Sequence, residues 1–111
     1  MFSGEETMTA LRLLADVVQE YCAGKKSGLL CVSIEKTSEN LLQFYLKNGR
    51  IYNLSFGPAK DKDCLDILDC YDLDTAIYFD GLKAFYSSTE LPPTEEIITE
   101  IRKSGKQVHV D

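Results

Sequence analysis

The strongest constraint on the fold is the segment Lys47-Asn48-Gly49-Arg50, which lies between two stretches of alternating apolar residues. A type I′ turn requires a positive backbone angle φ at both central residues, and Asn and Gly tolerate that conformation. The segment therefore predicts a β-hairpin with strands over residues 41–47 and 50–56. The first strand has a core face of Leu42, Phe44 and Leu46. In the second strand, one face carries Tyr52, Leu54 and Phe56 and the other carries Ile51, Asn53 and Ser55, and either could face the core.

Further strands are predicted on both sides of this hairpin. Residues 29–34 follow Gly28 with Leu30, Val32 and Ile34 at core positions, and Leu29 and Cys31 make the opposite face unusually apolar. The polar residues 35–40 read as a turn, so the three strands form an antiparallel meander. Two shorter strands are expected over residues 75–79 and 84–86, around Asp80-Gly81, with loop as the alternative for residues 84–86.

A capping-box pattern at residues 3–6 indicates an N-terminal helix that begins there or a few residues later. In this pattern the Ser3 hydroxyl accepts a backbone N–H of the first turn, and the Glu6 side chain accepts the backbone N–H of Ser3. We expect Gly24 to end this helix as its left-handed residue, with Lys25 against the negative end of the helix dipole. One apolar stripe at helical spacing faces the core: Leu11, Leu14, Ala15, Val18 and Cys22.

Two more helices are predicted in the second half of the chain. Gly57-Pro58 ends the preceding strand, and a helix over residues 60–71 follows. Its core face comprises Cys64, Ile67, Leu68 and Tyr71, and its opposite, exposed face carries Asp63, Asp66 and Asp69. A last helix over residues 95–103 turns Ile97, Ile98 and Ile101 inward and stops at Gly105.

The pattern predicts one α+β domain over residues 1–111. Its antiparallel sheet has about four to five strands, packed by an N-terminal helix, a central acidic helix and a C-terminal helix. No apolar run approaches the roughly 20 residues that span a bilayer. The acidic N-terminus also lacks the apolar region of a signal peptide, so a cytoplasmic location is expected.

The net charge of -6 argues against nucleic acid or an anionic membrane as a partner, because both require a cationic surface. The charge is unevenly distributed. Residues 60–80 contain seven aspartates and two lysines, whereas residues 24–53 contain five basic and two acidic side chains. A dipolar module of this kind suits a charged protein partner or a second copy of itself in a homodimer.

The residue types offer little to catalysis. The four cysteines form no C-x-x-C motif, and Cys22, Cys31 and Cys64 fall on predicted core faces, so reduced structural thiols are expected. The series from Asp61 to Asp72 departs from a calcium loop at its fifth, sixth and twelfth positions. We therefore expect no catalytic, cofactor or metal site, and a protein that is not an enzyme.

The chain resembles the bacterial PATAN-like regulatory domains over about residues 7–103. The resemblance lies in a basic residue and Gly28 before an apolar strand, in the hairpin ending Gly49-Arg50-Ile51, in Ser55-Phe56-Gly57, in the helical segment 64–68 and in the strand 76–79. It implies a protein-interaction module of two-component signalling, a family without a known catalytic constellation. Since no receiver domain is present in this sequence, the implied adaptor acts in trans on response-regulator receivers.

Two candidate contact regions follow from the pattern. Tyr45, Lys47 and Arg50 lie on or beside the hairpin, where tyrosine and arginine suit protein interfaces. Arg50 could instead pair with Glu35 or Asp80. The second region is the acidic face, Asp63, Asp66 and Asp69, which would steer a basic partner.

Two alternative functions stay open from the sequence. One is a small-ligand sensor with a closed apolar cavity. The other is a minor enzyme that uses a cysteine or His109.

Overall fold

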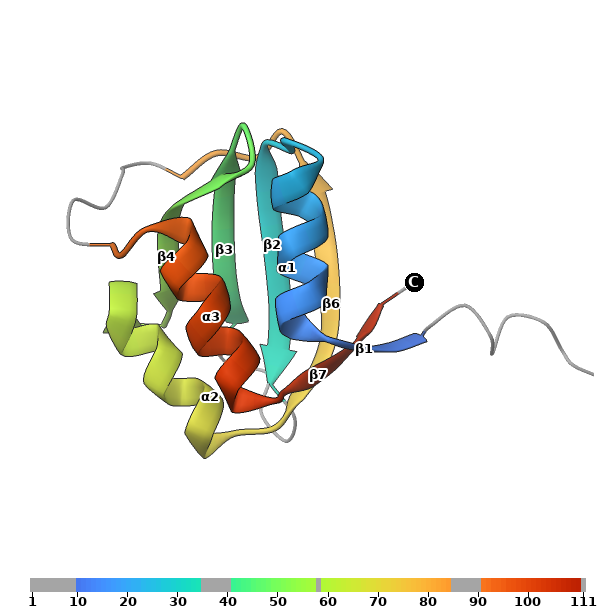
Figure 1. Cartoon of the computed structure of the whole chain (residues 1–111), viewed down its shortest axis with the longest axis vertical. Coiled ribbons are helices and arrows are strands. Elements are labelled where there is room, and N and C mark those ends of the chain that lie inside the picture. Colours follow the sequence, from blue (N-terminus) through green and yellow to red (C-terminus); the bar gives the residue numbers. More distant parts are fainter. Residues whose placement is uncertain (1–9, 35–40, 58, 85–90, 111) are drawn as a thin grey trace, which may run out of the picture.

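The computed structural model describes residues 10–34, 41–57, 59–84 and 91–110, and this part of the chain is α+β (Figure 1). The strands are β1 (Ala10–Leu13), β2 (Gly28–Ile34), β3 (Leu41–Lys47), β4 (Arg50–Phe56), β5 (Ala59–Lys60), β6 (Leu73–Asp80) and β7 (Gln107–Val110). The helical segments are α1 (Leu14–Ala23), the 3-10 helix η2 (Asp61–Asp66) continued by α2 (Ile67–Cys70), and α3 (Thr94–Ser104).

The predicted α+β class is confirmed, but the predicted sheet of about four to five antiparallel strands is wrong in detail. The described residues form a mixed sheet of seven strands in the order β1-β7-β6-β2-β3-β4-β5. β6 and β7 pair in parallel at Thr75 and His109, and the other neighbours are antiparallel. The additional strands are the short ones: β1, β5 and β7 have too few residues for a clear alternating pattern.

The hairpin forms as predicted. Asn48 and Gly49 have φ of 50° and 80°, the positive values that a type I′ turn requires. β4 nevertheless follows neither predicted alternation, because its register with β3 shifts between the pairs Tyr45–Asn53 and Leu46–Ile51. This bulge leaves Tyr52 without a partner residue on β3 and places Ile51, Leu54 and Phe56 in the core.

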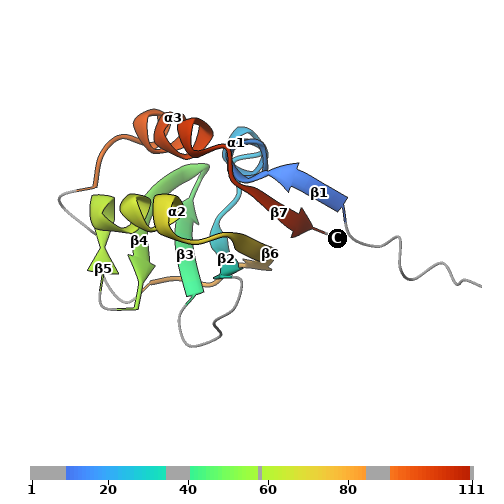
Figure 2. The same ribbon diagram turned by 90° about the horizontal axis from the view of Figure 1, so that it is seen from below.

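One face of the sheet is covered by helices and carries the core. Figure 2 shows α1 and α3 side by side above this inner face, and the η2–α2 segment packs against α3 and β4. The predicted core positions of β2 and β3 are buried, as are Leu14, Val18, Ile97 and Ile101 of the helices. The opposite face of β2, β3, β4 and β6, here called the open face, has no helix over it (Figure 2).

The N-terminal prediction was wrong for residues 10–13. Leu11 was expected in the helical stripe, but it lies in β1 with its side chain exposed. The backbone of β1 pairs with β7, and the Leu14 N–H donates to the Lys106 carbonyl at 3.0 Å, so α1 begins only at Leu14. The predicted capping box falls on residues 3–6, outside the described part of the chain.

Three smaller predictions also need correction. The residue of positive φ after α1 is Lys25, at 54°, while Gly24 has φ of -79°. The predicted helix over residues 60–71 begins as β5 and η2, and Tyr71 lies beyond its end with an exposed side chain. Ala84 lies outside any strand, and the rest of the strand expected at 84–86, like the turn expected at 35–40, falls on residues that the structure does not describe.

Candidate functional site

The three hairpin residues singled out from the sequence do not share one surface. Tyr45 is half-buried on the open face, where its ring centroid lies 6.2 Å from that of Tyr52. Burial, then Cys31 and Tyr52, raise the pKa of Tyr45. Lys47 is exposed and lines a cavity of about 460 Å³ with Tyr52 and Leu82. The Arg50 side chain instead reaches the helix layer.

Arg50 pairs with a residue that sequence reasoning did not consider. Its Nη1 and Nη2 donate to Oε2 and Oε1 of Glu95 at 2.6 and 3.4 Å, rather than to Asp80. Glu35 lies outside the described residues. A hydrogen bond from its own backbone N–H, followed by Arg50, lowers the pKa of the Glu95 carboxyl. The Glu95 carboxylate therefore already accepts a backbone N–H at the N-terminus of α3.

The predicted acidic face exists and is larger than expected. Asp63, Asp66 and Asp69 are all exposed. Asp63 and Asp66 line a cavity of about 370 Å³ together with Glu96 and Glu100 of α3. The two glutamates could have been found from their spacing, since residues i and i+4 lie on the same face of a helix. The acidic face, taken here as the three aspartates with Glu96 and Glu100, does not share a cavity with Lys47 or Arg50.

The open face carries an exposed apolar cluster that the sequence interpretation did not identify. Ile77 and Phe79 of β6 are 51% and 44% exposed, and Leu82 just after β6 is 49% exposed. Ile77 and Phe79 lie opposite Cys31 and Leu29 of β2. The sequence could have shown this cluster, because Ile77 and Phe79 lie two positions apart in a strand and Ala76 and Tyr78 take the inner face.

The segment after β6 crosses part of this open face. The Gly81 N–H donates to the Ser27 carbonyl at 2.9 Å, and the Ala84 N–H donates to the Tyr52 hydroxyl at 3.0 Å. In Figure 2 residues 81–84, which follow β6, run beneath the sheet, on the side away from the helices. Tyr52, the bulge residue of β4, therefore anchors this crossing segment.

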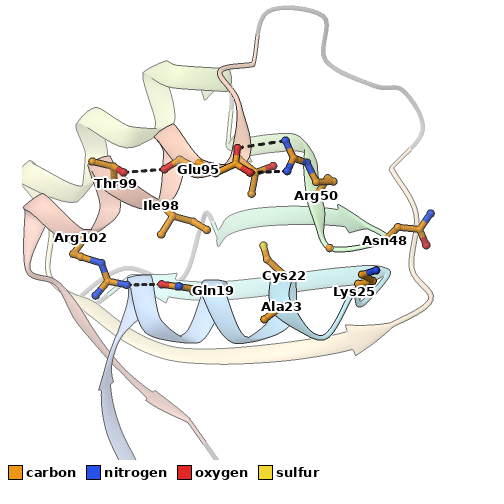
Figure 3. Close-up of a pocket in the computed structure, with 12 residues that line it drawn as sticks. Gln19, Cys22, Ala23, Lys25, Asn48, Arg50, Glu95, Ile98, Thr99 and Arg102 are labelled. Atoms are coloured by element: carbon orange, nitrogen blue, oxygen red, sulfur yellow. Dashed lines mark hydrogen bonds and ion pairs between the residues drawn. The ribbon is translucent and has the colours of Figure 1, made fainter.

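A groove lies between α1 and α3 at the end of the molecule where the hairpin turns. Its cavity measures about 570 Å³ and is lined by three elements: Gln19, Cys22 and Ala23 of α1 with Lys25 after it, then Asn48, Gly49 and Arg50, then Thr94, Glu95, Ile98, Thr99 and Arg102 of α3 (Figure 3). Arg102 Nη1 donates to Asp16 at 2.9 Å and its Nη2 to Gln19 at 2.7 Å, so the two helices are tied together at the far end.

Burial changes the pKa of two thiols and of the Tyr78 hydroxyl. None of the four cysteines, all in the described part of the chain, forms a disulfide bond; Cys64 is buried, Cys22 and Cys31 are half-buried, and Cys70 is exposed. Burial raises the pKa of Cys22 and Cys31. Burial and then the hydrogen bond to Asp80 raise the pKa of Tyr78 to about 12. His109 is exposed on β7.

Within the described ranges, no three His, Cys, Asp or Glu side chains gather in a way that could hold a metal ion. No helix in that part of the chain is long and apolar enough to cross a membrane. Comparison with known proteins found no matching family model, characterised protein or solved structure.

Proposed function

We propose that the protein is a non-catalytic interaction module of bacterial signal transduction that docks another protein on its open face. The observation that supports this best is the apolar cluster Ile77, Phe79 and Leu82, about half of whose side-chain surface is exposed. Exposed apolar groups that adjoin one another on a folded protein characterise interaction sites. Tyr45 and Tyr52 lie on the same face and offer contact area at low entropic cost.

The proposed partner is a response-regulator receiver, bound in trans in the cytoplasm. The PATAN-like resemblance supports the partner class, and the four free thiols fit a reducing compartment. Lys47 and the exposed Lys83 line a cavity with Leu82, so a partner surface with acidic groups beside an apolar centre would fit this end of the open face.

The acidic face has a second, longer-range role in this proposal. Asp63, Asp66 and Asp69 would orient a basic part of the partner before contact, because surface potentials act over about 8 Å at physiological salt. Steering of this kind changes association rates more than the stability of the complex.

The test is direct binding of purified receivers encoded in the same genome, with and without phosphorylation, to the full chain. Replacing both apolar groups in Ile77→Ser/Phe79→Ser should weaken binding by about 10- to 100-fold, the usual effect of losing an aromatic contact at the centre of an interface. Leu11→Ser is the matched control, since Leu11 is equally exposed but lies on β1. A receiver that binds the double variant as tightly as the wild type would contradict the open-face site, and the absence of any bound receiver would contradict the partner class.

A further inference from the structure

The groove between α1 and α3 is cationic although the chain is acidic. Three cations line it, Lys25, Arg50 and Arg102, and the single carboxylate in its lining is Glu95. Asp16 pairs with Arg102 beside this lining, so the local balance is +1 in a chain whose net charge is -6. The volume of about 570 Å³ is within the range of small-molecule sites, about 300–1,000 Å³. The charge and the size together indicate a small anionic ligand.

The cations lie at two ends of the groove, with an apolar middle. Figure 3 shows Arg50 and Lys25 at the hairpin end, Arg102 at the opposite end, and Ile98 and Cys22 between them. The eight residues from Glu95 to Arg102 are seven steps of a helix and extend about 10 Å along it. A ligand that matches this lining carries acidic groups at both ends of an apolar chain.

The hairpin end can accept such an anion without breaking a strong internal contact. Arg50 and Glu95 have side chains 59% and 72% exposed, and an ion pair this exposed stabilises a protein little. A ligand carboxylate could therefore replace Glu95 on the planar guanidinium. Among the described residues, Lys25 makes no ion pair, so its ammonium is available at the same end.

The groove is also held in shape before any ligand arrives. Gly49 packs so closely on the end of α1 that an added Cβ would lie 2.3 Å from the Cys22 carbonyl oxygen. The Gly49 N–H donates to the Lys26 carbonyl at 2.9 Å, and Arg102 Nη2 donates to Gln19 at 2.7 Å, which links α3 to α1. The ion pair of Arg102 with Asp16 has side chains 44% and 47% exposed and stabilises the protein little, so a ligand carboxylate could replace Asp16 there. A preorganised site avoids part of the ordering cost of binding.

We propose that this groove binds a linear organic dicarboxylate, with one carboxylate on Arg50 and Lys25 and the other on Arg102. The site lies on the helix side of the sheet and is independent of the docking proposed for the open face. It also differs from a sensor with a closed apolar cavity, because this groove is open and lined by charges.

The first test is a titration of the full chain followed by amide NMR shifts, at constant ionic strength, with succinate, adipate and suberate. Octanoate and inorganic phosphate serve as probes with a single acidic group. We expect saturable shifts at Gln19, Gly49 and Thr99, and binding of the best dicarboxylate about tenfold tighter than octanoate, because a second charge-assisted contact forms. Shifts that do not saturate, or equal binding of octanoate, would overturn the proposal.

Three variants separate this site from general charge attraction. Arg50→Gln should weaken binding about tenfold by removing a bidentate contact, whereas Glu95→Gln should strengthen it about threefold by removing the competing carboxylate. Lys103→Gln removes one exposed cation from the same helix outside the groove and should leave binding unchanged. Thermal unfolding curves establish that both variants are folded. If Arg50→Gln and Lys103→Gln then lose the same amount of ligand affinity, binding depends only on overall charge, and the site is refuted.

Discussion

Gly49 and Gly81 have almost the same backbone conformation, with φ of 80° and 81°, but different surroundings. At Gly81 an added Cβ would meet nothing within 4 Å, whereas at Gly49 it would meet the backbone of α1 at 2.3 Å. Gly81 is therefore required by conformation alone, and Gly49 by conformation and close packing.

This pair separates the two costs experimentally. Gly81→Ala should lower the free energy of unfolding by about 1–2 kcal/mol, the cost of a left-handed conformation for an L-residue. Gly49→Ala should cost at least about 2 kcal/mol more, because the hairpin must move away from α1. Urea denaturation of both variants measures the difference, and equal losses would show that the hairpin moves freely.

Tyr78 makes the stability depend on alkaline pH. Its ring stacks on Tyr21 at 4.4 Å, and its hydroxyl donates to Asp80 at 3.0 Å. Burial and this carboxylate raise its pKa from 10.0 to about 12 in the folded protein, so the native state holds a proton that the unfolded chain loses.

The contribution of Tyr78 should be complete below pH 10 and disappear as the pH rises to about 12. Tyr78→Phe keeps the stacked ring and removes the titrating group. Denaturation curves across that pH range should therefore fall less steeply for the variant than for the wild type. Identical slopes in the two proteins would contradict the raised pKa.

At the scale of elements, local patterns predicted the structure where a strand alternates regularly against its partner. β2, β3 and the two turn residues follow from alternation and from the φ that Asn48 and Gly49 tolerate. The same pattern could not show the bulge at Tyr52, because an extra residue in one strand is visible only against its partner. β1 and β7 were missed because each is defined by pairing with a segment almost the whole chain away.

The junction of β4 and α3 depends on one buried hydroxyl. Thr94 is 4% exposed, and its Oγ1 accepts the Ile51 N–H at 3.0 Å next to the bulge. Thr94→Val keeps the shape but leaves that N–H without its acceptor, which should cost about 1–3 kcal/mol of unfolding free energy.

Thr99→Val is the matched control for this junction. Its hydroxyl donates to the Glu95 carbonyl of the same helix and is exposed, so the change should cost less than about 0.5 kcal/mol. Chemical denaturation of both variants gives the comparison, and faster hydrogen exchange at Ile51 would locate the effect in Thr94→Val. A Thr94→Val protein as stable as Thr99→Val would exclude this role.

Across the whole molecule, the charges and apolar groups are divided among separate surfaces. The helix layer carries the cationic groove and the acidic face, and the open face carries the apolar cluster. The sequence predicted the acidic side chains because helical spacing places them together. It did not predict the groove, whose lining comes from α1, the hairpin turn and α3 and depends on how the helices pack.

The four thiols report on the integrity of the whole fold. Cys70 should react first with Ellman's reagent because it is exposed, and Cys22 and Cys31 more slowly because burial raises their pKa and lowers the thiolate fraction. Cys64 should react only on unfolding, at a rate that follows denaturant concentration. Cys70→Ser should remove the fastest phase; its persistence in that variant would contradict the assignment.

The pairing of β1 with β7 has a consequence for how this domain can be joined to other proteins. Ala10 and Val110 are directly opposed, and opposed residues in antiparallel strands lie about 5 Å apart. A host protein could therefore accommodate the domain within one of its surface loops without separating the loop's ends. A short tether between the same two points would equally allow the backbone to be closed into a ring and reopened elsewhere.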